Sequence, residues 1–452
     1  MTALAVDLDR RPDTGAAYDV VAQVHLGVFY TGVGPQLVWS DPDGLDHTAV
    51  STYLRIVQLL ERGLFDAFFL GDGQRVRENR GRIHDLDPSG RPDAITQLSA
   101  LASVTHRIGL VATQNATYNH PAELSRRLAG LDLLSGGRAG WNIVTTDNAW
   151  TGANFRAGAW LPHERRYERA AAFAATATAL WQSWGADVPV EAHSELVRTT
   201  ARATVPPSPQ GRPVLFQSGD SSGGRDLAAA HADVVYSLNT EFDSAVSYAK
   251  DLRTRLRACG RSVDSVRILP GATVILGATE AEATDKARWV LEQQMSPPRA
   301  LAFFEQFWGT DLSGYDPHGP LPDIEPSPDE LDPSRGTITP ERRTGKTALI
   351  ASWRAMAAER RLSIVQLARE VGTRRAPFVG TPGRVADQFA HYVRTRAADG
   401  FNLGPHTIPS SLEDVVNLLV PELQERGVYR SAYTGSTLRE HLALPAPAGA
   451  AS

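Results

Sequence analysis

Cysteine and lysine are both scarce in this chain of 452 residues. The single cysteine, Cys259, excludes an internal disulfide framework and a thiolate metal cluster within one chain. The only lysines, at positions 250, 286 and 346, lack the context of a Schiff-base or phosphate-loop lysine. His163-Glu164 is followed by Arg-Arg-Tyr, which is not a zinc-helix pattern. We therefore expect no metal site.

Long apolar runs are also missing. No stretch approaches the roughly 18 apolar residues that cross a bilayer, and residues 1–15 mix aspartate and arginine where a secretory signal would be apolar. The formal net charge is −5, and charges of both signs are scattered rather than gathered in a basic stripe. These absences predict a soluble, cytoplasmic protein that has neither a membrane nor a nucleic acid as its partner.

Short apolar runs alternate with longer helical patterns along most of the chain. The expected strands are 20–29, 65–70, 107–112, 138–145, 213–217, 233–238, 266–276 and 399–403. The expected helices are 48–62, 93–104, 121–134, 163–184, 223–231, 244–258 and 412–426. This alternation implies parallel strands with right-handed crossovers. Eight such units predict an α/β fold, a (β/α)8 TIM barrel with insertions.

One barrel spanning residues 20–444 accounts for this pattern, and two segments interrupt it. Residues 185–211 form a polar connection, and residues 279–375 surround a loop rich in proline and aspartate. Long loops in compact domains are often lids, and the loop after strand seven of a barrel lies on the catalytic face. We therefore expect a lid at about 279–375, with flexible termini at 1–19 and 445–452.

A glycine- and serine-rich turn follows the fifth expected strand, where residues 217–225 read Gln-Ser-Gly-Asp-Ser-Ser-Gly-Gly-Arg. Gly219 to Gly223 match the nucleophile elbow of hydrolases, but neither His231 nor His406 has a recognisable catalytic context downstream. The same turn could instead bind an anion at a helix N-terminus, or simply cap the helix. Asp220 opposes phosphate binding unless its carboxylate turns away to cap the helix.

Other polar residues occupy positions where a barrel places ligands. Asp72 and Thr113 end the second and third expected strands, and Asn142 lies inside the fourth, where a buried amide needs a partner. His163 and Tyr167 share one helical face and could donate two hydrogen bonds to a phosphate. Capping or packing roles are the alternatives at each of these positions.

Several longer strings then resemble a known family. The string Ser-Gly-Gly-Arg-Ala-Gly-Trp-Asn-Ile-Val-Thr-Thr at 135–146 resembles the strand-four signature of bacterial luciferase-like, flavin-dependent monooxygenases. The most similar branch contains the nitrilotriacetate and dibenzothiophene-sulfone monooxygenases. Further matching strings lie in order at 153–155, 163–170, 209–213, 378–382, 398–401, 420–427 and 433–439, so that the resemblance runs from about residue 22 to 444.

The resemblance implies a barrel that binds reduced FMN, which a separate NAD(P)H:flavin reductase supplies. A flavin hydroperoxide formed with dioxygen would then oxygenate a small organic substrate, at or beside nitrogen or sulfur. By position, the FMN contacts would be Asp72, Thr113, His163, Tyr167 and Ser221, the last three near the phosphate, with Asn142 beside the ring. The candidate proton donors are His25 and His120, and Phe29, Phe69, Phe307 and Trp308 could line an aromatic pocket.

A homo-oligomer, either a dimer or a tetramer, is also expected. Three features depart from the family pattern: Asp220 replaces a small neutral residue, Trp39-Ser40 replaces a Trp-Arg pair, and residues 185–206 lack a glycine-containing turn. Two rival functions remain. One is a deazaflavin-dependent oxidoreductase of the same fold, and the other is a non-catalytic flavin-binding protein.

Overall fold

A computed structural model describes residues 23–32, 37–38, 41, 43–74, 78–79, 82–83, 92–145, 149–156, 161, 163–327, 340–373 and 375–447. The predictions for residues 1–22, Trp39-Ser40 and 448–452 lie outside these ranges. Within them, no helix is long and apolar enough to cross a membrane.

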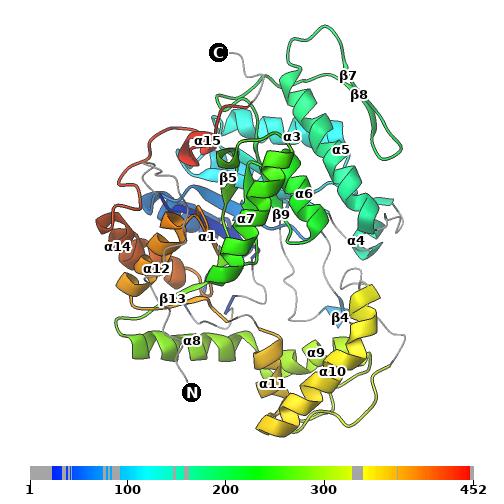
Figure 1. Ribbon diagram of the computed structural model, residues 1–452, viewed down its shortest axis with the longest axis vertical. Helices are drawn as coiled ribbons and strands as arrows, with labels where there is room; N and C mark the ends of the chain where they lie inside the picture. Colours follow the sequence, from blue (N-terminus) through cyan, green and yellow to red (C-terminus); the bar gives the residue numbers. More distant parts are fainter. Residues whose placement is uncertain are drawn as a thin grey trace.

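A single parallel sheet forms the centre of the molecule (Figure 1). Its strands, in spatial order, are β11 (Arg267–Ile268), β10 (Val234–Tyr236), β9 (Val214–Ser218), β6 (Ala139–Val144), β5 (Gly109–Asn115), β2 (Ala67–Leu70), β1 (His25–Tyr30), β15 (Gly400–Leu403) and β12 (Gly271–Ala272). The two end strands, β11 and β12, are halves of one segment, residues 267–272. That segment pairs with β10 on one side and β15 on the other, so the sheet closes. The predicted eight-stranded TIM barrel is confirmed.

The prediction of one strand over residues 266–276 is wrong in its second half. After β12 the chain leaves the barrel, and β13 (Val274–Leu276) pairs with β14 (Phe378–Gly380) in a separate two-stranded sheet. Ile275 packs with Val290 of the following helix rather than inside the barrel. The apolar run is continuous because both halves are buried, which hides the bend from a sequence pattern.

Helices cover the outside of the barrel, because each buries an apolar stripe against the strands. In α1, for example, Tyr53, Ile56, Val57 and Leu60 recur at helical spacing and are buried. The covering helices are α1 (Val50–Arg62), α2 (Ala94–Ala102), α3 (Pro121–Leu134), α5 (His163–Gln182), α6 (Ser222–His231), α7 (Phe242–Ala258), α12 (Pro382–Arg394) and the run α13 (Ser410–Asp414), η3 (Val415–Leu419) and α14 (Val420–Glu425). α3 has the predicted bounds, since Pro121 occupies its first turn.

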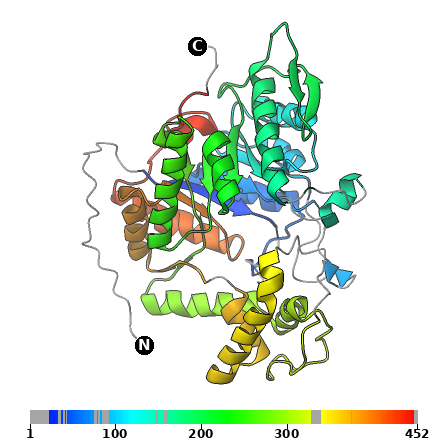
Figure 2. The ribbon, with the colours of Figure 1, turned by 45° about the vertical axis from the view of Figure 1, so that its right-hand side comes forward.

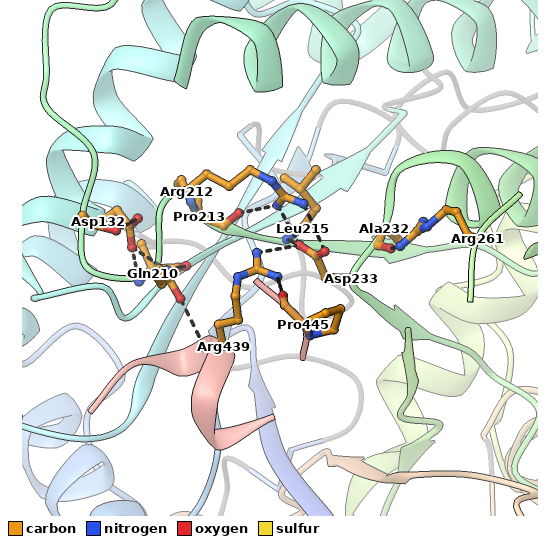
Figure 3. Close-up of polar contacts among 12 residues, drawn as sticks. Asp132, Gln210, Arg212, Pro213, Leu215, Ala232, Asp233, Arg261, Arg439 and Pro445 are labelled. Atoms are coloured by element: carbon orange, nitrogen blue, oxygen red, sulfur yellow. Dashed lines mark hydrogen bonds and ion pairs between the residues drawn. The ribbon is translucent and has the colours of Figure 1, made fainter. Parts of the chain in front are cut away.

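The amino-terminal end of the barrel is closed by α15 (Leu438–His441), on the side of the molecule opposite the inserted helices (Figure 1). Leu438 and Leu442 join Phe69, Val111 and Phe216 in the apolar cluster inside the barrel. At the same end, Arg439 donates to Asp233, which also accepts from Arg212 and from the Leu215 amide (Figure 3).

A second buried carboxylate, Asp132, lies beside this network (Figure 3). It accepts hydrogen bonds from the Ser208 hydroxyl, the Gln210 side chain and the Ala139 amide, at 2.5, 2.5 and 3.0 Å. No cation is hydrogen-bonded to it among the described residues. Burial therefore raises the pKa of Asp132 to about 6.

Among its described residues, the predicted insertion contains the helices α8 (Glu280–Gln294), α9 (Pro297–Trp308), α10 (Pro340–Arg360) and α11 (Ile364–Val371), grouped at the carboxyl-terminal side of the barrel (Figure 2). They have an apolar cluster of their own, which includes Phe304, Trp308 and Trp353. Residues 328–339 of the insertion lie outside the described residues, and its action as a lid stays a prediction.

Short elements complete the described chain, some where only loops were expected. The polar connection at 185–211 contains an antiparallel hairpin that projects past α5, visible in Figure 2. Half-buried and exposed residues alternate along its two strands, so neither carries an apolar run that marks it. The short elements are β3 (Glu78–Asn79), β4 (Arg82–Ile83), α4 (Ala149–Arg156), β7 (Val190–His193), β8 (Arg198–Ala201) and η1 (Val263–Ser265).

Candidate active site at the carboxyl-terminal mouth of the barrel

Three buried or half-buried polar side chains on adjacent strands form a hydrogen-bonded row near the carboxyl ends of β5, β6 and β9. Asn142 donates to the Thr113 hydroxyl at 3.1 Å and accepts from the Ser218 hydroxyl at 3.0 Å. Thr113 and Asn142 are direct register partners. These two bonds give the side-chain carbonyl of Asn142 and one of its amide hydrogens a hydrogen-bond partner. They also bring together Thr113 and Asn142, which were both predicted from the sequence. Ser218 is an addition that the sequence analysis missed.

The turn between β9 and α6 presents hydroxyl and amide groups at a helix N-terminus. Ser221 is the N-cap, and its hydroxyl oxygen accepts from the Gly224 amide at 3.1 Å. The Tyr167 hydroxyl lies 2.8 Å from the same oxygen. A Cβ on Gly223 would lie 3.0 Å from the Tyr167 ring, so glycine lets the turn and the ring approach each other. Because Ser221 and Ser222 are exposed, the positive end of α6 is open to an anion.

The Asp220 carboxylate points away from this turn. Its two oxygens accept from the Leu238 amide at 3.0 Å and from the Asn239 side chain at 2.9 Å, in the loop after β10. Arg225 also donates to the Asp220 carbonyl oxygen. The carboxylate thus turns away as phosphate binding requires, but it ties down a neighbouring loop, and Ser221 caps the helix instead.

The resemblance of this turn to a hydrolase elbow finds no support from the downstream histidines. His231 ends α6, about 15 Å along the helix from Ser221. His406 is buried, and burial lowers its pKa to about 3. The side chain hydrogen-bonded to the Ser221 hydroxyl is that of Tyr167, and a tyrosine is not the general base that an elbow serine needs.

Asp72 follows β2 at the same end of the barrel but makes other contacts. Its carboxylate accepts from the Gln74 amide at 3.0 Å and from the Gln114 side chain at 3.4 Å. Asn115, on the same strand as Thr113, also donates to the Gln74 side chain. Asp72 therefore belongs to a second polar group beside the row on β5, β6 and β9.

His163 and the two predicted proton donors lie in different surroundings. His163 is the first residue of α5, one turn before Tyr167, and its side chain lies outside the described residues. His120 is exposed just before α3 and lines a hollow with α3, α5 and the segment after β8. None of the described residues that line this hollow belongs to the polar groups at the barrel mouth, so His120 lies apart from those groups.

His25 begins β1 and therefore lies at the opposite, amino-terminal end of the barrel. Its Nδ1 is 3.1 Å from an oxygen of the buried Asp66, which also pairs with Arg430. Burial opposes ionisation of Asp66, but Arg430 and His25 hold its pKa below the usual range. Because TIM barrels carry their chemistry at the carboxyl-terminal face, this position removes His25 from the candidate site.

A cavity of about 710 Å³ opens between the barrel mouth and the insertion. Phe29, Tyr236 and Gly271 line it from the barrel, and one face of α8 lines it from the insertion. Phe69 packs edge-on behind Phe29, with ring centroids 5.1 Å apart. Of the predicted aromatic pocket, Phe29 alone lines this cavity. The other predicted members, Phe307 and Trp308, pack in the apolar cluster of the insertion.

The α8 wall was not found from the sequence. Its lining positions are 284, 287, 288, 290, 291 and 294, and they mix threonine, alanine, arginine, valine, leucine and glutamine. No apolar stripe marks that face. Among the described residues, no group of histidine, cysteine, aspartate or glutamate is arranged to hold a metal ion.

Comparison with known proteins agrees with this architecture. The family model "Luciferase-like monooxygenase" matches residues 33–399. Nitrilotriacetate monooxygenase component A from Aminobacter aminovorans is 34% identical over 93% of this chain and 95% of its own. N-acetyl-S-(2-succino)cysteine monooxygenase from Bacillus subtilis (strain 168) is 33% identical over 94% and 97%. A riboflavin lyase crystal structure with modified FMN and riboflavin has a TM-score of 0.75 and 29% identity, covering 93% and 95%. The chain therefore belongs to the luciferase-like monooxygenase family.

Proposed function

We propose that this chain is the oxygenating component of a two-component, FMN-dependent monooxygenase, acting on a small organic substrate at or beside nitrogen or sulfur. The enzyme class follows from the family to which the chain belongs. The names of the two relatives support the substrate class, since nitrilotriacetate contains a tertiary amine and N-acetyl-S-(2-succino)cysteine contains a thioether. The riboflavin lyase supports the cofactor, because its structure contains a modified FMN.

The open N-terminus of α6 is the observation that carries this proposal. A flavin phosphate there would meet the amides of the first turn, the Ser221 hydroxyl and the Tyr167 hydroxyl. Both carboxylate oxygens of Asp220 are bound to the loop after β10, so they do not occupy the first turn of α6 where the phosphate would lie. His163 would join the phosphate from the start of α5, as the family resemblance suggests. The residues present therefore fit a phosphate.

The row of Thr113, Asn142 and Ser218 would face the polar edge of the flavin ring. Asn142 keeps a second amide hydrogen that it does not use in the row, and that hydrogen could be donated to a ring acceptor. Asp72 would act from the neighbouring group with Gln114. Because Thr113 and Asn142 are buried, hydrogen bonds to a ligand at this site would be strong.

Reduced FMN, when bound, supplies two electrons to dioxygen, so that one oxygen atom enters the substrate and the other leaves as water. The chain would hold the flavin and the substrate in place and would exclude water from the site. Phe29, Phe69 and Phe216, whose rings pack edge-on in series, would form an aromatic floor, and the helices of the insertion would act as the lid. Excluding water from such a site limits the loss of electrons to hydrogen peroxide.

The word "component" in the nitrilotriacetate relative's name supports a separate NAD(P)H:flavin reductase as partner. Assembly of the chain into a dimer or tetramer stays a prediction. The rival functions are a deazaflavin-dependent oxidoreductase and a non-catalytic flavin-binding protein.

A reconstituted assay separates these possibilities. The purified chain is combined with a flavin reductase, NADH, FMN and isotopically labelled dioxygen, and a panel of amines and thioethers is offered as substrate. We expect one labelled oxygen atom in a product. Recovery of all electrons as hydrogen peroxide across the panel, or turnover only with reduced deazaflavin and without dioxygen, would overturn the proposal.

A further inference from the structure

The cavity beside the barrel mouth is lined by positive but not by negative side chains among the described residues. Among the described residues that line it, the only side chains charged at neutral pH are Arg288 and Arg375, and none is acidic. The protein as a whole carries a net charge of −5, so a wall with two cations and no anion contrasts with the overall balance. A cavity of this composition favours an anionic ligand over a neutral or cationic one.

The two arginines come from different walls. Arg288 lies on the α8 face that contains Thr284 and Leu291, and Arg375 lies in the segment that joins α11 to β14. Both are exposed, whereas Phe29 belongs to the barrel wall of the cavity. A ligand that meets both arginines would therefore have its charged group toward solvent and its remaining part toward the barrel.

Each arginine has an acidic partner that does not line the cavity. Arg288 is 3.1 Å from Asp285, with side-chain exposures of 64% and 68%, and Arg375 is 2.9 Å from Glu370, with exposures of 72% and 28%. Exposed ion pairs of this kind contribute at most about 1 kcal/mol. Both guanidinium groups can therefore exchange these partners for a ligand at little cost.

The other described residues of the wall are neutral. They include apolar side chains such as Ile275 and Val379 and the hydroxyls of Thr240 and Thr273. This mixture suits an apolar body with few polar groups. A guanidinium binds a carboxylate through two parallel hydrogen bonds, which also fixes the ligand's orientation.

We propose that the substrate is an organic carboxylate, whose carboxylate group binds Arg288 and Arg375 while its apolar part, carrying the atom to be oxygenated, lies toward Phe29. This inference rests on the proposed function, because it assigns the substrate class of the same site. Arg288 and Arg375 would recognise the substrate, and neither of them is among the proposed FMN contacts.

The test compares matched pairs of probes in which a carboxylate is replaced by a neutral carboxamide. The thioether pair is (benzylthio)acetate and 2-(benzylthio)acetamide, and the amine pair is N,N-dibenzylglycine and its primary amide. Dissociation constants are measured by calorimetry on the full chain saturated with oxidised FMN. We expect each carboxylate to bind at least about tenfold more tightly than its amide, as charge-assisted hydrogen bonds imply. The Arg288→Gln, Arg375→Gln double variant should lose that preference, whereas Arg55→Gln should keep it. Arg55 is the matched control because it is also exposed and paired, with Glu413, away from the cavity.

The result is separated from the proposed function by measuring FMN binding in the same samples. Equal affinity for carboxylate and amide, no binding of either pair, or an unchanged preference in the double variant would overturn the inference while FMN still binds. Failure of the wild-type chain to bind reduced FMN in an anaerobic titration would instead overturn the proposed function. Loss of the preference in the double variant with FMN binding intact supports the inference.

Discussion

Substitutions of Ser221 can distinguish the two roles of its hydroxyl, which are capping of α6 and binding of the flavin phosphate. The Ser221 oxygen caps α6 by accepting from the Gly224 amide, and it would also contact the flavin phosphate together with Tyr167. Alanine removes both functions. Glycine removes the hydroxyl too, but it is a much better N-cap than alanine, so the pair Ser221→Ala and Ser221→Gly distinguishes capping from ligand binding.

The expected magnitudes follow from these contacts. Loss of the cap in Ser221→Ala should lower the free energy of unfolding by about 1 kcal/mol, whereas Ser221→Gly should cost only a few tenths. Loss of a hydrogen bond to a charged phosphate costs about 1.5–3 kcal/mol, which corresponds to roughly a 10- to 100-fold rise in the dissociation constant for FMN. Both variants should show that rise to a similar extent.

The assay is anaerobic titration of reduced FMN, followed by flavin absorbance, with reduced riboflavin as the matched ligand that lacks the phosphate. Both variants should weaken FMN binding and leave riboflavin binding nearly unchanged, and urea unfolding should separate the two variants in stability. An equal loss of affinity for both ligands, or no loss for FMN, would refute the phosphate site on α6.

Substitutions at three further positions test the loop beside the site, the aromatic floor and the amino-terminal end of the barrel. Asp220→Ala removes two hydrogen bonds to the loop after β10 and should lower the free energy of unfolding by about 2 kcal/mol, with a smaller loss in Asp220→Asn, as measured by urea unfolding. Phe69→Ala empties the aromatic floor between Phe29 and Phe216 and should cost about 3–5 kcal/mol in the same assay. Burial raises the folded-state pKa of Asp132 to about 6, above its unfolded value of 3.8, so the folded state binds this proton more tightly and loses stability as the pH rises. The free energy of unfolding should therefore fall by about 1 kcal/mol between about pH 5 and about pH 7 on account of this group, and Asp132→Asn should remove that part of the slope. An unchanged slope in the variant would show that Asp132 does not titrate in this range.

The barrel could be predicted because its strands are buried on both sides and read as short apolar runs between helices. The helix α3 was predicted at its observed bounds, since Pro121 marks its first turn and Ser135-Gly136-Gly137 follow its end. The same logic failed at residues 266–276, where a buried strand in the barrel continues into a buried strand outside it. Apolar patterning reports burial, and it does not report which sheet a strand joins.

The candidate site was predicted in part. Strand ends and a glycine-rich turn located Thr113, Asn142 and Ser221, because carboxyl ends of parallel strands meet at one face. The direction of the Asp220 carboxylate depends on a loop after another strand, and no local pattern encodes it. His25 lies in the middle of the expected strand 20–29 but is the first residue of β1, so the apolar run alone did not show which end of the barrel it occupies.

Rapid mixing gives the most direct test of the central claim, that this barrel holds reduced FMN while it reacts with dioxygen. The anaerobic complex of the chain with reduced FMN is mixed with oxygenated buffer, and the return of oxidised flavin is followed by absorbance beside a sample of free reduced FMN. We predict that oxidised flavin returns more slowly with the wild-type chain, and that Ser221→Ala at limiting flavin shifts the reaction toward the rate of the free cofactor. Return of oxidised flavin at the same rate with and without the wild-type chain would contradict the claim.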